Sequence, residues 1–236
     1  HGGIDRTIVD AGQEVAMQVE HEGRAKIQRR SVSASRGPRR GLGIFLTRPI
    51  GFAISVRHYI PQEFVHMNTK AYGALAGDKP LQPLDITRRQ PGLRAVQIEV
   101  KYCGVGHSDL HTVRFGWGGT LYPCVPGHEI VGQATAVGAE VANFKVGETV
   151  GVGCLVGSCK RCGSCAEGLE QYCENGFVGT YNGPTDDAPG HTLGGYSQTI
   201  VVDEQFVLKI RHPADQLAAV APLLWAGITT YSSLRH

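Results

Sequence analysis

Four cysteines fall within fifteen residues, at the spacing C-x2-C-x2-C-x7-C. Two residues between ligands make a tight turn that points both sulfurs the same way, and the longer gap lets the fourth cysteine return from the opposite side. The spacing predicts a structural zinc knuckle over residues 159–173, held by Cys159, Cys162, Cys165 and Cys173. Because four thiolates fill every position of a tetrahedral ion, this knuckle would organise a lobe and perform no chemistry.

Two other interpretations of the cysteines are open. The four could form a pair of disulfides, or they could pack as small apolar groups. Four cysteines so close together are difficult to pair without strain, which favours zinc. Three more cysteines, Cys103, Cys124 and Cys154, bring the total to an odd seven, which suits a reducing compartment. We therefore expect a cytoplasmic protein.

Composition narrows the fold class. With 42% apolar residues among 236, the chain can build a buried core, and 32 glycines favour tight turns and short strands over long helices. We expect a mainly β fold with some α. The formal net charge of +2 gives no reason to expect nucleic acid as a partner, and no apolar run approaches the roughly 20 residues that span a bilayer.

The first 66 residues differ from the rest of the chain. They carry ten Lys or Arg and six Asp or Glu, and residues 22–41 are rich in Arg, Ser and Gly without apolar periodicity. Such a segment could be a transit peptide, a basic arm for polyanions, or an extension upstream of a native start at Met67. We favour the last interpretation and expect residues 1–66 to be disordered or non-native.

From Met67 onward, alternating apolar and polar residues predict half-buried strands. The expected strands are residues 93–101, 129–137, 148–150, 196–202 and 205–210. Pro123, Pro126-Gly127 and Asn182-Gly183-Pro184 supply turns between them. After Pro213, residues 214–224 predict a helix, with Pro222 breaking it or opening a second helix that reaches Leu234.

Two stretches concentrate polar side chains in this apolar frame, Cys103–His111 and Gly127-His128-Glu129. A histidine beside an acid is usually a satisfied structural pair. Together with the cysteine knuckle, however, these motifs resemble a known family. They are Tyr102-Cys103-Gly104-Val105, His107-Ser108-Asp109-Leu110-His111, Val125-Pro126-Gly127-His128-Glu129-Ile130-Val131-Gly132, Gly194-Gly195-Tyr196 and Ala226-Gly227-Ile228-Thr229-Thr230-Tyr231.

Residues 67–236 resemble the catalytic domain of the zinc-dependent medium-chain alcohol dehydrogenases, in particular the NADP-dependent cinnamyl-alcohol-dehydrogenase-like branch. The resemblance implies a GroES-like barrel with the zinc lobe inserted, and a chain that oxidises small alcohols or reduces aldehydes with NADP. It implies that His128 is a ligand of a catalytic zinc, that Glu129 is the neighbouring acid that can approach the metal, and that Asp109 orients the histidine.

The same resemblance implies roles for four further residues. Ser108 and His111 would pass the alcohol proton to solvent, as suits a hydroxyl and a group that titrates near neutral pH. His107 would lie near the cofactor pyrophosphate, and Thr229 would touch the nicotinamide.

The chain departs from the family at both cysteine ligands of the catalytic zinc. The first matches Gly106, which offers no ligand atom, and the second matches Trp225, whose ring nitrogen has no lone pair to donate. One histidine and one carboxylate remain, fewer than the three protein ligands of such sites. Glycines 151, 153 and 157 do not fit the G-x-G-x-x-G turn of a Rossmann unit, so we expect the cofactor domain to be absent.

Three functional hypotheses follow. The first is an alcohol dehydrogenase by descent, truncated and without its catalytic metal, so that this chain alone is inactive. The second is a zinc-stabilised binding or regulatory module that pairs with an intact homologue. The third is an accessory to nucleic acid that acts through residues 1–66.

Overall fold

A computed structural model of the chain describes residues 16–18 and 66–235. These belong to one of the two units into which the chain divides, formed by His1–His21 and Phe64–His236. Of the expected extension over residues 1–66, only Ala16–Gln18 and His66 are described. Its status as a separate segment therefore stays a prediction, and the first long strand starts at Met67.

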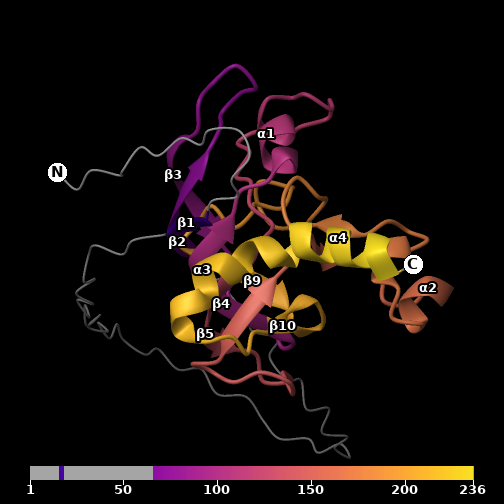
Figure 1. Cartoon of the computed structure of the whole chain (residues 1–236). Helices are drawn as coiled ribbons and strands as arrows, with labels where there is room; N and C mark the ends of the chain where they lie inside the picture. The colour runs from indigo at the N-terminus through magenta and orange to yellow at the C-terminus, as the bar shows by residue number, and fades with distance from the viewer. Residues whose placement is uncertain (1–15, 19–65, 236) are drawn as a thin grey trace, which may run out of the picture. The chain divides into compact units, whose positions relative to one another are not determined.

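The largest sheet has six strands, and its pairings are antiparallel (Figure 1). Strand β4 pairs with β5 along one edge and with β9 and β1 along the other. Beyond β5 follow β6 and then β10. The bounds are β1 Ala16–Gln18, β4 Ala95–Gly104, β5 Ile130–Val137, β6 Thr149–Val152, β9 Thr199–Asp203 and β10 Leu208–Lys209.

Buried and half-buried residues alternate along β4, and the buried ones form part of the core. Val96, Ile98 and Val100 are fully buried, whereas Gln97 and Glu99 between them are half-buried. Burying each such aliphatic side chain contributes about 1.5–3 kcal/mol, so this strand anchors the fold. The strand expected over residues 93–101 is confirmed, although it begins at Ala95 and continues to Gly104 because its later residues keep pairing with β5 and β1.

Two smaller sheets complete the strands. β2 (Met67–Gly73) pairs with β3 (Gln82–Arg88), and β7 (Leu155–Gly157) pairs with β8 (Val178–Gly179). A single bridge between Ala71 and Ser197 links β2 to the segment that leads into β9. The mainly β fold is confirmed, but among residues 66–235 the strand pairs form three sheets and close no barrel.

The helices are short and come late in the chain, apart from α1 (His107–Val113) and α2 (Gly163–Ala166). After Pro213 the chain forms successive short helical segments, of which three cover the first expected helix over residues 214–224 and the fourth is the second helix that was expected to reach Leu234. Pro222 opens one of them, as its fixed φ allows. They are η3 Ala214–Gln216, α3 Leu217–Val220, η4 Ala221–Leu224 and α4 Ala226–Arg235.

The strands expected over residues 196–202 and 205–210 are wrong at their starts. The backbone N–H of Tyr196 donates to the Pro126 carbonyl, and the Tyr196 carbonyl accepts the N–H of Tyr72. This stretch therefore connects two segments and does not pair as a strand of the sheet. In the second case the Asp203 carboxylate accepts the N–H of Gln205 and caps η2 (Glu204–Phe206). Only the two residues of β10 then pair with β6.

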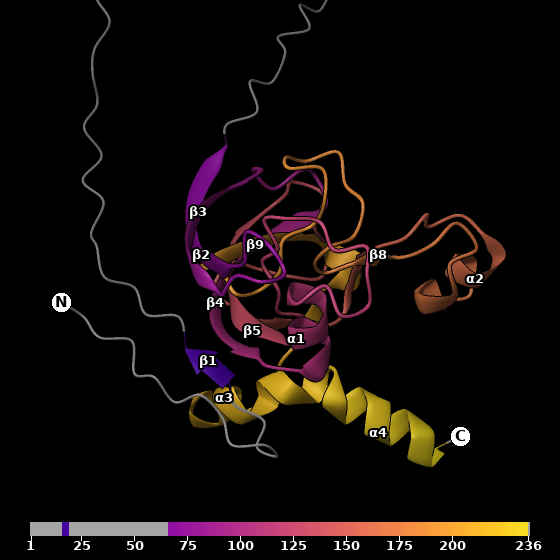
Figure 2. The ribbon, with the colours of Figure 1, turned by 90° about the horizontal axis from the view of Figure 1, so that it is seen from above.

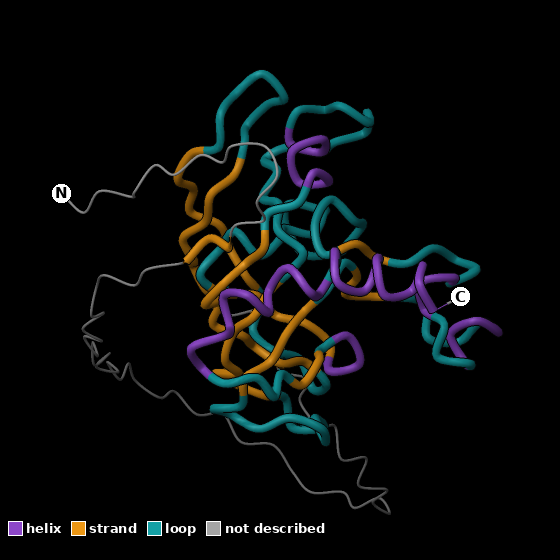
Figure 3. The backbone as a smooth tube through the Cα atoms, viewed as in Figure 1, coloured by secondary structure: helices purple, strands orange, loops and turns teal. Residues whose placement is uncertain are grey.

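Loops and turns fill much of the chain between the strands, and α2 lies in a lobe set apart from the sheet (Figures 2 and 3). Helix α4 has no buried residue. No single helix among the described residues is long and apolar enough to cross a membrane. The pair Ala214–Leu224 and Ala226–Arg235, bent by 61°, meets that criterion by length and composition alone.

Candidate metal centres

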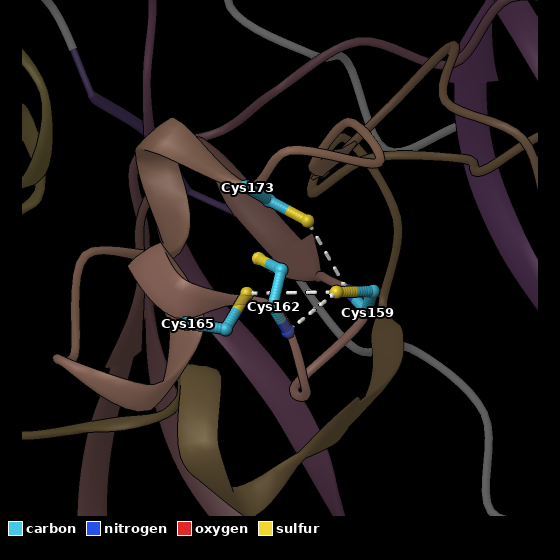
Figure 4. A group of neighbouring side chains, drawn as sticks. All are labelled: Cys159, Cys162, Cys165 and Cys173. Atoms are coloured by element: carbon cyan, nitrogen blue, oxygen red, sulfur yellow. Dashed lines mark hydrogen bonds between the residues drawn. The ribbon is translucent and has the colours of Figure 1, made fainter.

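The four cysteines of the predicted knuckle converge. Their sulfurs all lie within 4.8 Å of one another, and the Cys159 and Cys165 sulfurs are 3.9 Å apart (Figure 4). Cys165 and Cys173 are buried, and Cys159 and Cys162 are half-buried. All are free of disulfides. Four mutually close thiols suit one shared tetrahedral ion better than two separate disulfides.

Local backbone geometry explains this convergence. Lys160 has φ of 57°, a left-handed turn that brings the Cys162 N–H within 3.4 Å of the Cys159 sulfur. Cys162 then begins α2, which carries Cys165, and η1 (Glu170–Tyr172) leads into Cys173. The N–H groups of Cys159 and Glu174 approach the sulfurs of Cys173 and Cys162, each at 3.4 Å.

The electrostatics at Cys159 favour its thiolate form. Hydrogen bonds from the Arg161 backbone, and then from the Asn175 side chain, lower the pKa of Cys159 to about 6. A thiol must lose its proton to bind zinc, so these donors prepare the site for a cation. The donor set and its closeness fit a structural zinc ion, which would supply folding free energy and no reaction.

A second polar group forms around Asp109. Its carboxylate accepts the N–H groups of Gly106 and Gly127 at 2.9 and 2.8 Å, and Oδ1 lies 3.1 Å from His128 Nδ1. Asp109 and His128 are 3% and 4% exposed, so water cannot replace these bonds. Sequence reasoning expected Asp109 to orient His128, and the structure brings them together.

Glu129 is also buried beside this group. A Cβ at Gly104 would overlap its carboxylate, so the close approach requires glycine there. The Ala226 N–H points to Glu129 Oε1 at 3.4 Å, which links Glu129 to the start of α4.

The two positions that depart from the family both flank His128. A Cβ at Gly106 would lie 3.7 Å from His128 Cε1, an ordinary contact. The Trp225 ring meets the imidazole edge-on, with 5.3 Å between the ring centroids. The two expected ligand positions therefore lie beside the histidine, but one is a glycine without a side chain and the other carries an indole.

These residues do not fit a catalytic zinc. His128 and Glu129 supply two ligand groups where three protein ligands are needed, and the Trp225 indole, which offers no lone pair, packs against the His128 ring. Within residues 66–235, the four cysteines are the one group of three or more His, Cys, Asp or Glu side chains close enough to share an ion.

The remaining expected site residues fall on two helices. His107, Ser108 and His111 share α1 with Asp109, and both histidines are exposed. Thr229 is exposed on α4, where its N–H donates to the Trp225 carbonyl at 2.9 Å. Their expected roles toward a proton and a cofactor stay predictions.

Sequence reasoning missed two residues, Tyr181 beside His128 and Arg88, which joins β3 to residues 193–199. Tyr181 contacts His128 from a loop, with 5.4 Å between the ring centroids, and no local pattern marks it. Arg88 ends β3 and donates to the carbonyls of Thr199, Leu193 and Gly194 and to Ser197 Oγ, at 2.8–2.9 Å. Burial lowers the pKa of Arg88 to about 10, although the negative charge of Asp187 acts to raise it. The adjacent arginines Arg88 and Arg89 are its only trace in the sequence, because β3 was not expected.

This fold and these motifs match those of known proteins. Residues 92–212 match the family described as the alcohol dehydrogenase GroES-like domain, and the chain belongs to that family.

Its relatives include aldehyde reductase YahK of Escherichia coli (strain K12), which is 65% identical over 170 residues, or 72% of this chain and 48% of the relative. NADP-dependent alcohol dehydrogenase C of Mycobacterium tuberculosis (strain CDC 1551 / Oshkosh) is 52% identical over 70% of this chain and 47% of its own length. The chain thus spans about half the length of these relatives.

A solved structure shares the fold as well. The CAD from Helicobacter pylori, crystallised with NADP(H), superposes with a TM-score of 0.67 at 42% identity, over 72% of this chain and 49% of that one. The family resemblance seen in the motifs is thereby confirmed.

Proposed function

We propose that this chain corresponds to the catalytic half of a zinc-dependent, NADP-type alcohol dehydrogenase or aldehyde reductase, and that it is inactive on its own. Support for the reaction class comes from the relatives, which are named as an aldehyde reductase and an NADP-dependent alcohol dehydrogenase. The substrates would be primary or aromatic alcohols and aldehydes. The odd number of cysteines, none of which lies in a disulfide in this structure, favours a cytoplasmic location.

One observation carries the proposed inactivity. The Asp109 carboxylate holds His128 as it would hold a metal ligand, and the two positions that the family resemblance assigns to the thiolates are Gly106 and Trp225, both beside His128. Without a metal to polarise the alcohol oxygen, this chain has no described group that stabilises an alkoxide. The one metal expected is the zinc of the cysteine cluster, with a structural role.

The test combines metal analysis with an assay. The full chain should hold about one zinc, because one closed site is present. It should not oxidise NADPH in the presence of an aromatic aldehyde, while the Escherichia coli relative, prepared in parallel, serves as the active control. Turnover above background, or two zinc ions per chain, would contradict the proposal.

A second candidate is a binding module that pairs with an intact homologous dehydrogenase. Helix α4 favours it, since its apolar residues Ile228, Tyr231 and Leu234 are 51%, 63% and 89% exposed at successive turns. Sedimentation of the chain mixed with the intact relative would show a faster complex, and Tyr231→Ser with Leu234→Ser should abolish it.

A further inference from the structure

A small cavity lies between the end of β3 and the loop over residues 185–193. Its volume is about 70 Å³, enough for several water molecules at roughly 10–15 Å³ each, and therefore for one small ion. None of the residues that line it belongs to the cysteine cluster or to the group around His128. The cavity has no role in the function proposed above.

One wall of the cavity carries an arginine that forms no ion pair within residues 66–235. The Arg88 guanidinium is half-buried and donates four hydrogen bonds, which leaves one N–H without a partner in this part of the chain. All four acceptors are neutral, three backbone carbonyls and the Ser197 hydroxyl. Burial lowers the pKa of Arg88 to about 10, and the charge of Asp187 offsets this only in part. An anion in the cavity would therefore stabilise the charged form of Arg88.

Three other side chains that line the cavity keep unused hydrogen-bond donors. Arg89 pairs with Asp187 through Nε alone, at 3.0 Å, so both of its terminal nitrogens lack a partner among the described residues. The Thr185 hydroxyl accepts the Asp187 N–H at 3.2 Å and keeps its own proton to donate. Thr87 is exposed, and its hydroxyl bonds to no other described residue. The cavity therefore suits a ligand that is negatively charged and rich in hydrogen-bond acceptors.

We propose that this cavity binds a phosphate group, held by Arg88 and Arg89 together with the hydroxyls of Thr87 and Thr185. The two terminal nitrogens of Arg89 suit the bidentate contact that arginine makes with phosphate. A phosphate presents more oxygens to these donors than a carboxylate does, so it satisfies more of them. Inorganic phosphate and small phosphate monoesters share this chemistry, and their affinities tell them apart.

Asp187 opposes an anion and so provides a sensitive test. Its side chain is 49% exposed and pairs with Arg89, so it neutralises part of the positive charge at the cavity. Asp187→Asn should therefore tighten phosphate binding about fivefold, because it removes a like charge at a partly exposed position. Asp186→Asn is the matched control, since it removes the same charge from the adjacent exposed residue, which does not line the cavity. It should change the affinity by less than about twofold, because solvent and salt screen that charge.

Calorimetric titration of the zinc-loaded full chain, freed of excess zinc, measures binding at constant ionic strength. Inorganic phosphate and phenyl phosphate are the probes, and acetate is the comparison anion. At least one probe should bind saturably and more tightly than acetate, and the tighter of the two identifies the source of the group. Arg89→Gln should weaken binding at least about tenfold, because it removes charge-assisted hydrogen bonds. Arg211→Gln, at an exposed arginine outside the cavity, should leave it unchanged.

Chemical protection locates the phosphate in the unaltered chain. Bound phosphate should slow the reaction of Arg89 with phenylglyoxal, read by peptide mass spectrometry, while Arg211 reacts at its original rate. The proposal is overturned if neither the original chain nor the Asp187→Asn variant binds either probe saturably. It is also overturned if Arg89→Gln binds as the original chain does, or if Arg89 is not protected.

Discussion

At the scale of single residues, what stands beside His128 decides whether the catalytic zinc expected in the family could bind. Gly106 has φ of −111°, a conformation open to any residue, and a Cβ there meets the His128 ring at 3.7 Å without overlap. A thiol at this position would lie next to the imidazole. Trp225 approaches the same ring from a different segment, so replacing it both frees space and adds a ligand.

We expect Gly106→Cys combined with Trp225→Cys to bind a second ion. Two thiolates and His128 would give the three protein ligands of an open site. Metal content should rise from about one to about two per chain, with added cobalt–thiolate absorption after substitution by Co²⁺. Gly106→Ser with Trp225→Ser is the matched control, because it opens the same space without sulfur. An unchanged spectrum in the cysteine variant would contradict the assignment of these two positions.

A second residue-scale prediction concerns Glu204, which is 4% exposed. Burial alone would raise its pKa, but the N–H groups of Asn143 and Ala142 and the charge of Arg94 outweigh it, so the pKa is lowered. A lowered carboxyl pKa stabilises the fold above the unfolded value near 4.3, and this contribution disappears as pH falls through the folded pKa.

Glu204→Gln should therefore reduce the free energy of unfolding by about 1–3 kcal/mol at pH 7, since an amide cannot accept all these donors. The difference from the original chain should narrow below about pH 4.3. Urea unfolding across this range measures it, with the exposed Glu140→Gln as control. A difference independent of pH would show that packing, and not the charge, is responsible.

At the scale of elements, the cysteine lobe has few contacts with the rest of the described chain that would hold it in the absence of a bound ion. Helix α2 has four residues and η1 has three, too short to be stable alone. Its contacts to η2 and β9 are polar, from Lys160 to Asp203 and from Gln205 to Glu170, each at 2.5 Å. The large core cluster is built from residues outside the cysteine segment.

Removing zinc should consequently unfold the lobe and spare the sheet. We expect Cys162→Ser to bring zinc well below one per chain and to raise hydrogen exchange in residues 158–175, while β4 and β5 stay protected. Cys154→Ser, which alters a cysteine outside the cluster, should keep both zinc and protection. Equal protection of the lobe in the two variants would mean that metal does not order it.

The elements also show what the sequence could and could not predict. Cysteine spacing and the alternation in β4 are local signals, so the lobe and the central strand were predictable. The hairpin β2–β3 was not expected, because its strands are half exposed and include Gly73 and Pro83. The contacts of His128 with Tyr181 and Trp225 join distant segments, and no single-strand pattern contains them.

At the scale of the whole molecule, the open question is what residues 1–66 add. Ala16–Gln18 pairs with Tyr102–Gly104, at the end of β4. Those β4 residues Tyr102 and Cys103 also pair with β5 on the other edge, and residues 95–99 pair with β9. The core strand therefore keeps most of its partners without β1.

We expect a chain that starts at Met67 to fold, with a loss of about 1–2 kcal/mol for the few strand hydrogen bonds that disappear. It should retain one zinc and a single cooperative urea transition. Loss of cooperativity would show that the first 66 residues are part of the fold. If the full chain bound oligonucleotides in a salt-sensitive way and the shortened chain did not, residues 1–66 would instead be a basic arm for nucleic acid, since phosphate contacts release counterions and weaken as salt rises.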